Sequence, residues 1–243
     1  MAKFSSSAFS VLMADGISLL AAKVKGVTYG DESITEQTDG LGDDHEEHTP
    51  VGMSRATFTQ TGALFDDATD GMHLAFRANT DPSRILSFAA FGNTIGATFT
   101  GALGALKTKY EVLVNVGALT KANAAYQIDG AIEDGVILQT HVQQTIDWTN
   151  AAVDNGAASS AGGSAFLQVS QLAGITGFVG YVEDSADGSS GWAVIGTFSN
   201  ITAAPAAQRI TIAGTIRRWT RFRGDATGTG TITPFVGLTR FTA

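Results

Sequence analysis

Short apolar runs separated by Asp-Gly turns recur along this chain, and they constrain its fold more than any other feature. Two such runs flank the Asp-Gly pair of FSVLMADGISLL, which is the pattern of a β-hairpin. In SRATFTQTGALF, alternation places on one face Ala56, Phe58, Gln60 and Gly62. KYEVLVNVG alternates in the same way, and AAYQIDGAIEDGVIL adds a turn before a strand that ends at Leu138. The sequence predicts a mainly β protein.

One segment, FDDATDGMHLAFRANTDPSRILSFAAF, interrupts this pattern. Acidic residues precede an apolar group centred on Leu74, as expected for the first turn of a helix. Asp81 and Pro82 are expected to end this helix, and a short second helix is expected to begin at Pro82. The sequence therefore predicts one or two short helices within a mainly β fold.

The chain is expected to divide into two units. Residues 149–163 (TNAAVDNGAASSAGG) are small, polar and without periodicity, which is typical of a linker. The sequence before them, 1–148, contains the hairpins and the helix candidate. The sequence after them, 164–243, has only strand patterns and turns, which predicts a small β-sandwich of immunoglobulin-like or jelly-roll-like type. Under this division, proteolysis within 149–163 releases a stable C-terminal sandwich, and a chain ending at Asp147 still assembles.

Charge is unevenly distributed over these units. The whole chain has a net charge of −8, and residues 1–150 hold 9 Lys and Arg against 18 Asp and Glu, or −9. The remainder holds 6 Arg against 5 acids, or +1. An acidic first unit does not favour tight binding of nucleic-acid phosphates. The chain has no cysteine, which excludes disulfides, zinc-thiolate sites and thiol nucleophiles.

No signal peptide or membrane span is expected from the sequence. The apolar run near the N-terminus is broken by an Asp-Gly pair, and only Lys3 supplies early positive charge. No window reaches the roughly 18 continuous apolar residues that a spanning helix needs. We therefore expect a soluble protein that is made in a cytoplasm and has no membrane partner.

The most unusual local feature is an acidic loop. Between Asp31 and Glu47 the chain has eight acidic residues and no Lys or Arg. Such a run repels itself and is expected to become ordered only against a partner. We interpret its tip as a contact between subunits or rings of an assembly, formed by Asp39, Gly40, Leu41, Gly42, Asp43, Asp44, His45, Glu46, Glu47 and His48.

A metal site is the alternative interpretation of the DDHEEH core of this loop. Its histidines are three residues apart, whereas a catalytic zinc helix carries H-E-x-x-H, and Pro50 makes a helix improbable here. The segment also lacks the ligand spacing of an EF-hand. We therefore favour a solvated acidic loop over a metal centre, and we predict no metal or other cofactor.

No catalytic constellation can be named from the sequence. Neither G-x-S-x-G nor a phosphate-binding glycine motif is present. His73 and His141 stand alone, so each is expected to be a surface or structural histidine. The chain is predicted not to be an enzyme.

One cationic patch, IRRWTRFR, stands out in the second unit. If the segment is a strand, one face carries Arg217, Trp219, Arg221 and Arg223. Such a face can bind a sugar or a nucleic-acid strand, or its arginines can stack on aromatic rings within the protein or at a subunit interface. We favour the structural or interface role.

Two blocks of the sequence carry a family resemblance. GVTYGDESITEQTDGLGDDHEEHTPVGMSRATFTQTGALFDD resembles the N-terminal part of tail tube (major tail) proteins of long, non-contractile-tailed bacteriophages. There a strand leads into a long acidic loop and returns as a Thr- and Ser-rich strand. GALTKANAAYQIDGAIEDGVIL is similar to the closing strands of that family. The C-terminal unit is similar to β-sandwich modules appended to such tail proteins.

The resemblance implies a tail-tube-type β-sandwich or barrel and a structural role in the virion tail. Proteins of that family form rings, usually hexameric, that stack around a tape-measure protein into the tube for DNA ejection. The implied partners are further copies of this chain, the tape-measure protein, tail terminator and initiator proteins, and double-stranded DNA that passes without tight binding. Assembly would take place in the cytoplasm of the host bacterium. A capsid decoration protein and a carbohydrate-binding adhesin remain alternatives.

Overall fold

The computed structural model describes residues 10–19, 24–38, 48–65, 73, 77, 84–130, 132–145 and 147–242. The regular secondary structure of these residues is almost entirely strand, which confirms the predicted mainly β class. The strands are β1 (Val11–Ala14), β2 (Ile17–Ser18), β3 (Gly26–Gln37), β4 (His48–Leu64), β5 (Ile85–Ala89), β6 (Thr98–Leu103), β7 (Ala105–Leu113), β8 (Lys121–Ile128), β9 (Ile132–Gln139), β10 (Trp148–Thr149), β11 (Val153–Asp154), β12 (Gly163–Ser185), β13 (Ala193–Thr197), β14 (Ala206–Ile212) and β15 (Trp219–Arg240).

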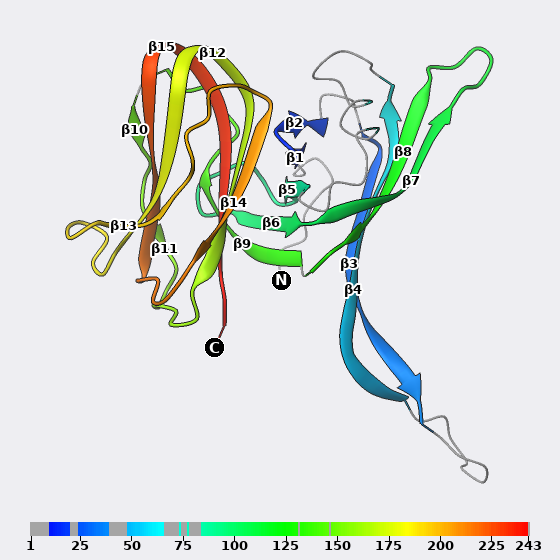
Figure 1. The fold of residues 1–243 in the computed structure, drawn as a ribbon, viewed down its shortest axis with the longest axis horizontal. Coiled ribbons are helices and arrows are strands. Elements are labelled where there is room, and N and C mark those ends of the chain that lie inside the picture. Colours follow the sequence, from blue (N-terminus) through cyan, green and yellow to red (C-terminus); the bar gives the residue numbers. More distant parts are fainter. Residues whose placement is uncertain are drawn as a thin grey trace.

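The strands form two sheets, both antiparallel. The smaller sheet has the order β3-β4-β8-β7, and the larger sheet follows the path β13-β12-β15-β9-β6-β5-β1-β2. Within the larger sheet, β10 and β11 pair with β15, and β14 pairs with β12. Figure 1 shows the strands β1, β5 and β6 between the C-terminal strands on one side and the smaller sheet on the other. The central strands are therefore covered on both faces.

The predicted N-terminal hairpin is present. Asp15 and Gly16 connect β1 to β2 with positive φ values of 49° and 85°, as a two-residue hairpin turn with a right-handed twist requires. A side chain at Gly16 would lie 2.3 Å from the backbone nitrogen of Ala206. Glycine is required here both by the turn and by the close approach of the C-terminal strands.

Two long strands connect the halves of the chain. β12 and β15 pair over almost their whole length, from Gly163 opposite Arg240 to Ser185 opposite Trp219. β15 then pairs on its other side with β9, which precedes the predicted linker. The larger sheet thus continues from the first half of the sequence into the second without a break in its hydrogen bonding.

Residues 149–163 are not free of regular structure, contrary to the expectation for a linker. β10 and β11 pair with β15, and Ser159 forms a bridge to Ile216. These pairings lie at long sequence separation, so small residues without periodicity gave no sign of them. The boundaries 1–148 and 164–243 remain a prediction, and the shared sheet does not favour a simple break between them.

Three clusters of buried side chains account for the core. The first lies between the smaller sheet and one face of β1 and β5, and it includes Phe58, Phe88 and Tyr126. The second fills the C-terminal unit around Phe178 and Phe222. The third joins the two, because Met13 and Phe99 from the first half pack with residues of the second, namely Phe166 and Phe235. The halves therefore share apolar core as well as a sheet.

A buried glutamine, Gln168 of β12, reinforces this junction. Its side-chain oxygen accepts from the Gly16 backbone nitrogen at 2.6 Å, and its amide donates to the Ile85 carbonyl at 3.2 Å and to Ser87 Oγ at 3.0 Å. Each of these partners is on β1–β2 or β5. Buried polar groups left without partners cost about 1–3 kcal/mol each.

We expect Gln168→Leu to lower the free energy of unfolding by about 1–3 kcal/mol, because it removes the hydrogen bond of the buried Gly16 nitrogen, whereas the Ile85 carbonyl keeps its bond from the Asp15 nitrogen. The matched control is Gln208→Leu. Gln208 also bonds main-chain groups, at both the nitrogen and the oxygen of Ser199, but these bonds are exposed. Denaturant unfolding of both variants measures the difference, and equal losses would contradict the junction role of Gln168.

The predicted helix around Leu74 lies mostly outside the described residues. The two residues of the segment that are described, His73 and Arg77, are helical. The second helix, expected to begin at Pro82, is wrong because strand β5 begins at Ile85. The run ILSFA, apolar except for Ser87, is buried on both faces as a strand. A short buried run of this kind cannot be assigned to helix or strand from its periodicity. No helix in the described part of the chain is long and apolar enough to span a membrane.

Candidate assembly surface

The smaller sheet has one packed face and one solvent face. In β8 the even-numbered residues from Ala122 to Ile128 are buried, while the odd-numbered residues between them are only half-buried. The predicted alternation in β4 is confirmed for Ala56, Phe58 and Gln60. A register shift after Gln60 then places Ala63 in the core where Gly62 was expected.

The solvent face is mainly polar and nearly balanced in charge, and its β7 end strand also contributes two exposed leucines, Leu106 and Leu113. Opposite residues of antiparallel strands share a face. The neutral members of the solvent face in the described strands include Thr28, Gly30, Thr57, Thr59, Thr61, Asn123, Ala125 and Gln127. Its charged members in the same strands are Glu32, Arg55, Lys109, Glu111 and Lys121. Lys109 and Glu111 form an ion pair at 2.8 Å. The face therefore presents hydroxyl and amide groups with little net charge.

Both edges of this sheet are open within the described part of the chain. β3 and β7 each have one neighbouring strand in the sheet. The β3 edge is acidic, because its charged side chains are Asp31, Glu32 and Glu36. The β7 edge carries Lys107, Lys109 and Glu111, so its net charge is +1. An open edge is a template for another strand, so these two edges of opposite charge are candidate contact surfaces.

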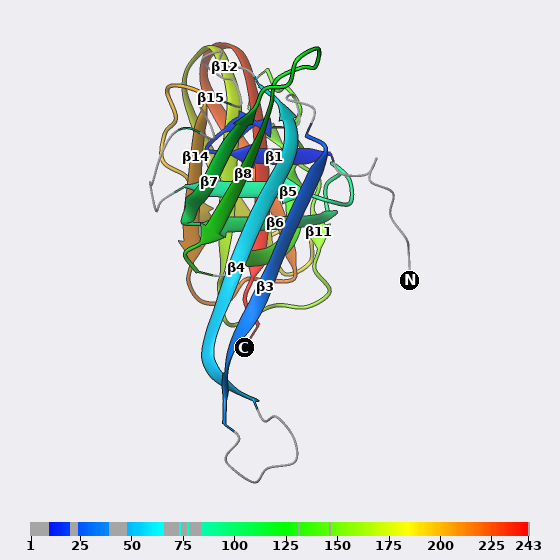
Figure 2. The ribbon, with the colours of Figure 1, turned by 90° about the vertical axis from the view of Figure 1, so that its right-hand side faces the viewer.

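The strands β3 and β4 also extend beyond the body as a two-stranded arm (Figures 1 and 2). The pairing of β4 with β8 ends at Ala56, whereas its pairing with β3 continues to His48 opposite Gln37. The β3 residues of the arm are exposed except Ile34, which is half-buried. Such an arm contributes little to the core of its own subunit, as expected for a segment that contacts another molecule.

The predicted interaction loop lies at the end of this arm. Residues 39–47, from Asp39 to Glu47, lie outside the described residues. His48 is described: it is exposed and is the first residue of β4. The assembly role of the loop stays a prediction. Among the described residues no group of three or more His, Cys, Asp or Glu side chains is placed to hold a metal ion.

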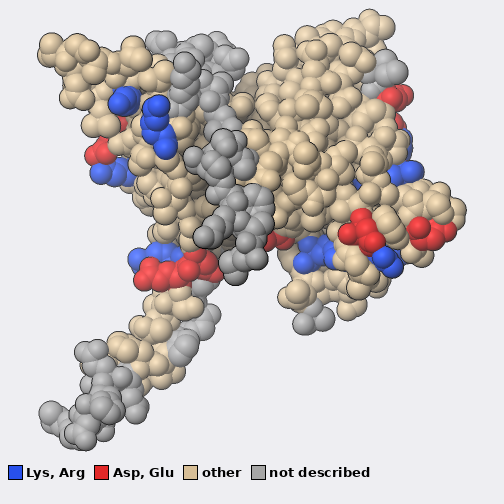
Figure 3. Space-filling model, turned by 180° about the vertical axis from the view of Figure 1, so that it is seen from behind, with Lys and Arg blue, Asp and Glu red and all other residues tan. Residues whose placement is uncertain are grey.

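The turn between β7 and β8 is an exposed apolar tip. The alternation predicted for KYEVLVNVG, with Val112, Val114 and Val116 on one face, is wrong beyond Leu113, where β7 ends. Val114 is 75% exposed, Val116 is fully exposed and Leu119 is 69% exposed. Figure 3 shows this projecting tip without charged side chains. Exposed apolar groups gathered on one projection indicate a contact surface.

The sequence-based interpretation missed this tip and both edges. Alternation of Val112, Val114 and Val116 predicts one continuous strand face, because periodicity does not show where a strand ends. The signal was available in Asn115 and Gly117, whose residue types favour turns. In the structure Gly117 has φ 75°, and Asn115 accepts a hydrogen bond from the Ala118 nitrogen.

The predicted cationic face exists in part, because Arg217 lies before β15, which begins at Trp219, and acidic residues of β12 bind its arginines. Trp219, Arg221 and Arg223 alternate with the buried residues Thr220 and Phe222, as the spacing predicts. Glu183 accepts from Arg221 Nε at 2.8 Å and from Arg223 Nε at 2.9 Å. Arg217 binds Asp184 through its side chain at 2.6 Å and through its backbone nitrogen at 2.8 Å.

Aromatic rings complete this network. Arg221 lies 4.0 Å from the centre of the Trp192 ring, and Arg223 lies 4.1 Å from that of Tyr181. The hydrogen bonds that Arg217 donates to Asp184 raise the pKa of the Arg217 guanidinium. Nearby, hydrogen bonds from Arg218 and the Gly156 nitrogen lower the pKa of Asp154 to about 2. Guanidinium groups satisfied in this way support a structural role in holding β15 to β12.

The remaining histidines have local partners. His73 Nδ1 lies 2.6 Å from the hydroxyl of Tyr110, and His141 Nε2 lies 2.9 Å from Ser170 Oγ. Burial lowers the pKa of His141, which favours its neutral form. In the described residues neither histidine is placed beside a nucleophile and a carboxylate as a catalytic base requires.

No family model matches the sequence, and no curated protein matches it. A structure described as "Tail of empty GTA particle computed with helical refinement, C6 symmetry" is 10% identical, with a TM-score of 0.34, over 45% of this chain and 79% of that chain. The "Virion of native gene transfer agent (GTA) particle" is 10% identical, with a TM-score of 0.39, over 54% and 97%. The Dit protein of phage SPP1, described as a hub of the adsorption apparatus, is 14% identical, with a TM-score of 0.38, over 95% and 98%. At these identities and TM-scores the likeness is distant and carries no assignment of family or function.

Proposed function

We propose that this protein is a structural component of a bacteriophage tail. Copies join through the open edges of the β3-β4-β8-β7 sheet into a ring, and rings stack into the tube that conducts DNA. The observation that carries the proposal is this sheet, with its packed face, its polar face and its two open edges. An enzyme role has no support among the described residues, where no catalytic grouping is assembled.

The number of strands suits closure into a ring. Because the four strands alternate in direction, β3 and β7 run antiparallel to each other. When a rotated second copy brings its β3 beside β7 of the first, the sheet continues as an antiparallel sheet. Repetition of the same rotation closes a barrel and leaves no edge exposed.

The solvent face of the sheet suits the wall of a DNA conduit. DNA carries about one negative charge per 1.7 Å of helix axis, so a lysine-rich wall would hold it. Here threonine is the most frequent residue of the solvent face, the charged residues of both signs nearly balance, and Lys109 is paired with Glu111. Such a wall allows double-stranded DNA to pass without tight binding.

Stacking is proposed to use the two projections at the ends of the sheet. Strands of a barrel run within roughly 35–45° of its axis. The acidic arm and the apolar β7–β8 tip leave the sheet in opposite directions (Figure 1), so they would project from opposite faces of a ring. The further partners are the tape-measure protein and the tail terminator and initiator proteins, in a virion tail assembled in the host cytoplasm.

A test of the acidic loop separates assembly from metal binding. We expect neutralisation of Asp43, Asp44, Glu46 and Glu47 to Asn or Gln to leave the subunit stable but to weaken polymerisation, because solvated like charges add little to a fold. Polymerisation of the unchanged protein should also depend on salt. Light scattering over a salt series, with elemental analysis of metal content, checks both. Bound metal that disappears in a His45→Ala/His48→Ala variant, with unchanged polymerisation of the neutralised variant, would contradict the assembly role.

The alternatives make different predictions about self-association. A capsid decoration protein binds a preformed shell and stays dispersed alone, and an adhesin module binds glycans through an open aromatic face. The Trp219 ring is half-buried and covers Gly188, where a Cβ would lie 2.6 Å from it, which supports a packing role. Sedimentation velocity over a concentration series tests the proposal. We expect a closed oligomer of fixed size, and a monomer at every concentration would contradict it.

A further inference from the structure

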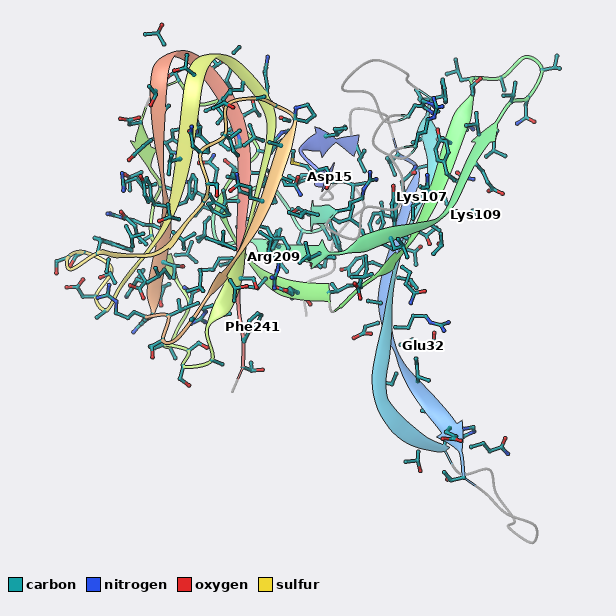
Figure 4. All side chains as sticks on the ribbon, viewed as in Figure 1. Asp15, Glu32, Lys107, Lys109, Arg209 and Phe241 are labelled. Carbon is teal, nitrogen blue, oxygen red and sulfur yellow. The ribbon has the colours of Figure 1, made fainter. Side chains whose placement is uncertain are left out.

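We infer that the ring closes in one register, in which β7 of one copy lies on β3 of the next with Lys109 opposite Glu32 and Val112 opposite Tyr29. This inference rests on the proposed ring function and names the contact that would join its subunits. The partner is a second copy of this chain. Figure 4 shows the lysines and Glu32 on the two different edges of the sheet, with Glu32 further toward the arm.

The strand pairing within one copy shows which residues lie side by side in one row across the sheet. Lys109 lies opposite Ala125, Ala125 lies opposite Thr59, and Thr59 lies opposite Thr28. These residues form one row that crosses all four strands on the solvent face. In a sheet without stagger, Lys109 of one copy would therefore meet Thr28 of the next.

A closed barrel requires a stagger between copies. Strands tilted by about 36° correspond to a shift of about one residue per strand, or about four residues for a four-stranded copy. A shift of four along β3 moves the partner of Lys109 from Thr28 to Glu32. A shift in the other direction runs off the strand, because β3 begins at Gly26. Only the shift toward Glu32 leaves every residue of Lys109–Leu113, the part of β7 that follows its register shift, opposite a residue of β3.

This register matches charges on the solvent face. The Lys109 side chain is 62% exposed, and Glu32 is exposed on β3. Directly opposite charges across a strand pair are favourable, and like charges are unfavourable. Pairing of two β3 edges would set acids against acids, because Asp31, Glu32 and Glu36 are the charged residues of β3. The β7 edge carries Glu111 as well as Lys107 and Lys109, so charge disfavours pairing of β3 with itself, and a head-to-tail contact of β3 with β7 can close a ring.

The same register matches apolar groups on the other face. With Lys109 opposite Glu32, antiparallel counting brings Val112 opposite Tyr29. These side chains are 42% and 37% exposed in the single chain. Each would cover the other, and Tyr29 already packs on the buried Phe88 ring at 4.5 Å, which continues the core across the seam. Charge on one face and apolar surface on the other therefore indicate the same alignment.

Engineered disulfides test the register, because the chain has no cysteine of its own. Opposite residues in an antiparallel pair have Cα atoms about 4.5–5.5 Å apart, within disulfide range. We expect Glu32→Cys/Lys109→Cys to give, on mild oxidation, a ladder of covalent oligomers that ends at the ring size. The matched control, Thr28→Cys/Lys109→Cys, places its cysteines about 13 Å apart along the strand in this register. It should stay monomeric on a denaturing gel.

The cross-linking results distinguish a wrong register from a wrong ring function. Ring formation by the unchanged protein, with cross-linking in the control pair or in neither pair, would overturn the register and leave the ring function standing. Absence of any ring from the unchanged protein would overturn the ring function and the register with it.

Charge reversal gives a second readout. Glu32→Lys and Lys109→Glu should each reduce ring formation at least tenfold, and the double variant should restore it. Thr59→Glu, which adds charge on the same row in an inner strand, should leave ring formation unchanged. Single variants without effect, or a double variant that is no better than the singles, would count against the pairing of Lys109 with Glu32.

Discussion

A chain that ends at Asp147 is expected not to fold cooperatively, although its sequence resembles a complete unit. The truncation removes β12 and β15, so β9 loses the strand on one of its sides. Phe99 loses both of its aromatic neighbours, Phe166 at 5.4 Å and Phe235 at 5.8 Å between ring centres. Loss of a single buried Phe side chain costs about 3–5 kcal/mol, and total stabilities are about 5–15 kcal/mol. Removal of a whole core layer should therefore abolish the fold.

Thermal unfolding followed by circular dichroism tests this expectation. The comparison is the piece 148–243, which retains nearly all of the second buried cluster and should keep strand structure with a broader transition. A sharp unfolding transition for 1–147, together with a dispersed monomer, would show that the halves are independent and that the junction through Gln168 and Phe99 is dispensable.

Replacement of Val114, Val116 and Leu119 by serine is expected to abolish tubes and to preserve rings. These side chains are among the most exposed apolar groups of the described chain, so their loss should not reduce the stability of the subunit. Full burial of such a side chain contributes about 1.5–3 kcal/mol, and 1.4 kcal/mol corresponds to a tenfold change in association. Loss of three should weaken the contact between rings by at least about a hundredfold.

The critical concentration for tube formation measures this effect, with electron microscopy to distinguish rings from tubes. Val194→Ser is the matched control, since Val194 is 48% exposed but belongs to β13, outside the smaller sheet. Tubes that form equally well from the triple variant would rule out the tip as a stacking contact. Rings lost together with tubes would place the tip at the seam between neighbours in a ring.

The local parts of the fold were predictable from the sequence. The hairpin at Asp15-Gly16 and the alternation of Ala56, Phe58 and Gln60 depend on neighbours two residues apart. The pairing of β9 with β15 joins Gly135 to Thr239. This pairing puts both halves of the chain in one sheet and does not favour a simple division into two units. No local pattern records a contact at that separation. The length of β12 and β15 is also invisible to local patterns, because register shifts near Gly174 and Gly177 interrupt their alternation.

In the candidate sites, too, the local arrangement was predictable from the sequence and the long-range contacts were not. Spacing alone predicted that Trp219, Arg221 and Arg223 share a face. It could not supply Glu183 and Asp184, which come from the neighbouring long strand and turn the cationic face into an internal network. Acidic residues on β3 were visible in the sequence as a charge run. Their relation to lysines on β7 became visible only with the strand order, which places the two at opposite edges of one sheet.

Electron microscopy of the purified full-length protein tests the central claim most directly. The account predicts rings, and stacks of rings at higher concentration, with one constant diameter. Six copies would give about 24 strands and a bore of about 45 Å between opposite backbones. Class averages should show that bore lined by the β3-β4-β8-β7 sheet. Particles that remain single subunits at every concentration, including with tail initiator proteins present, would contradict the account.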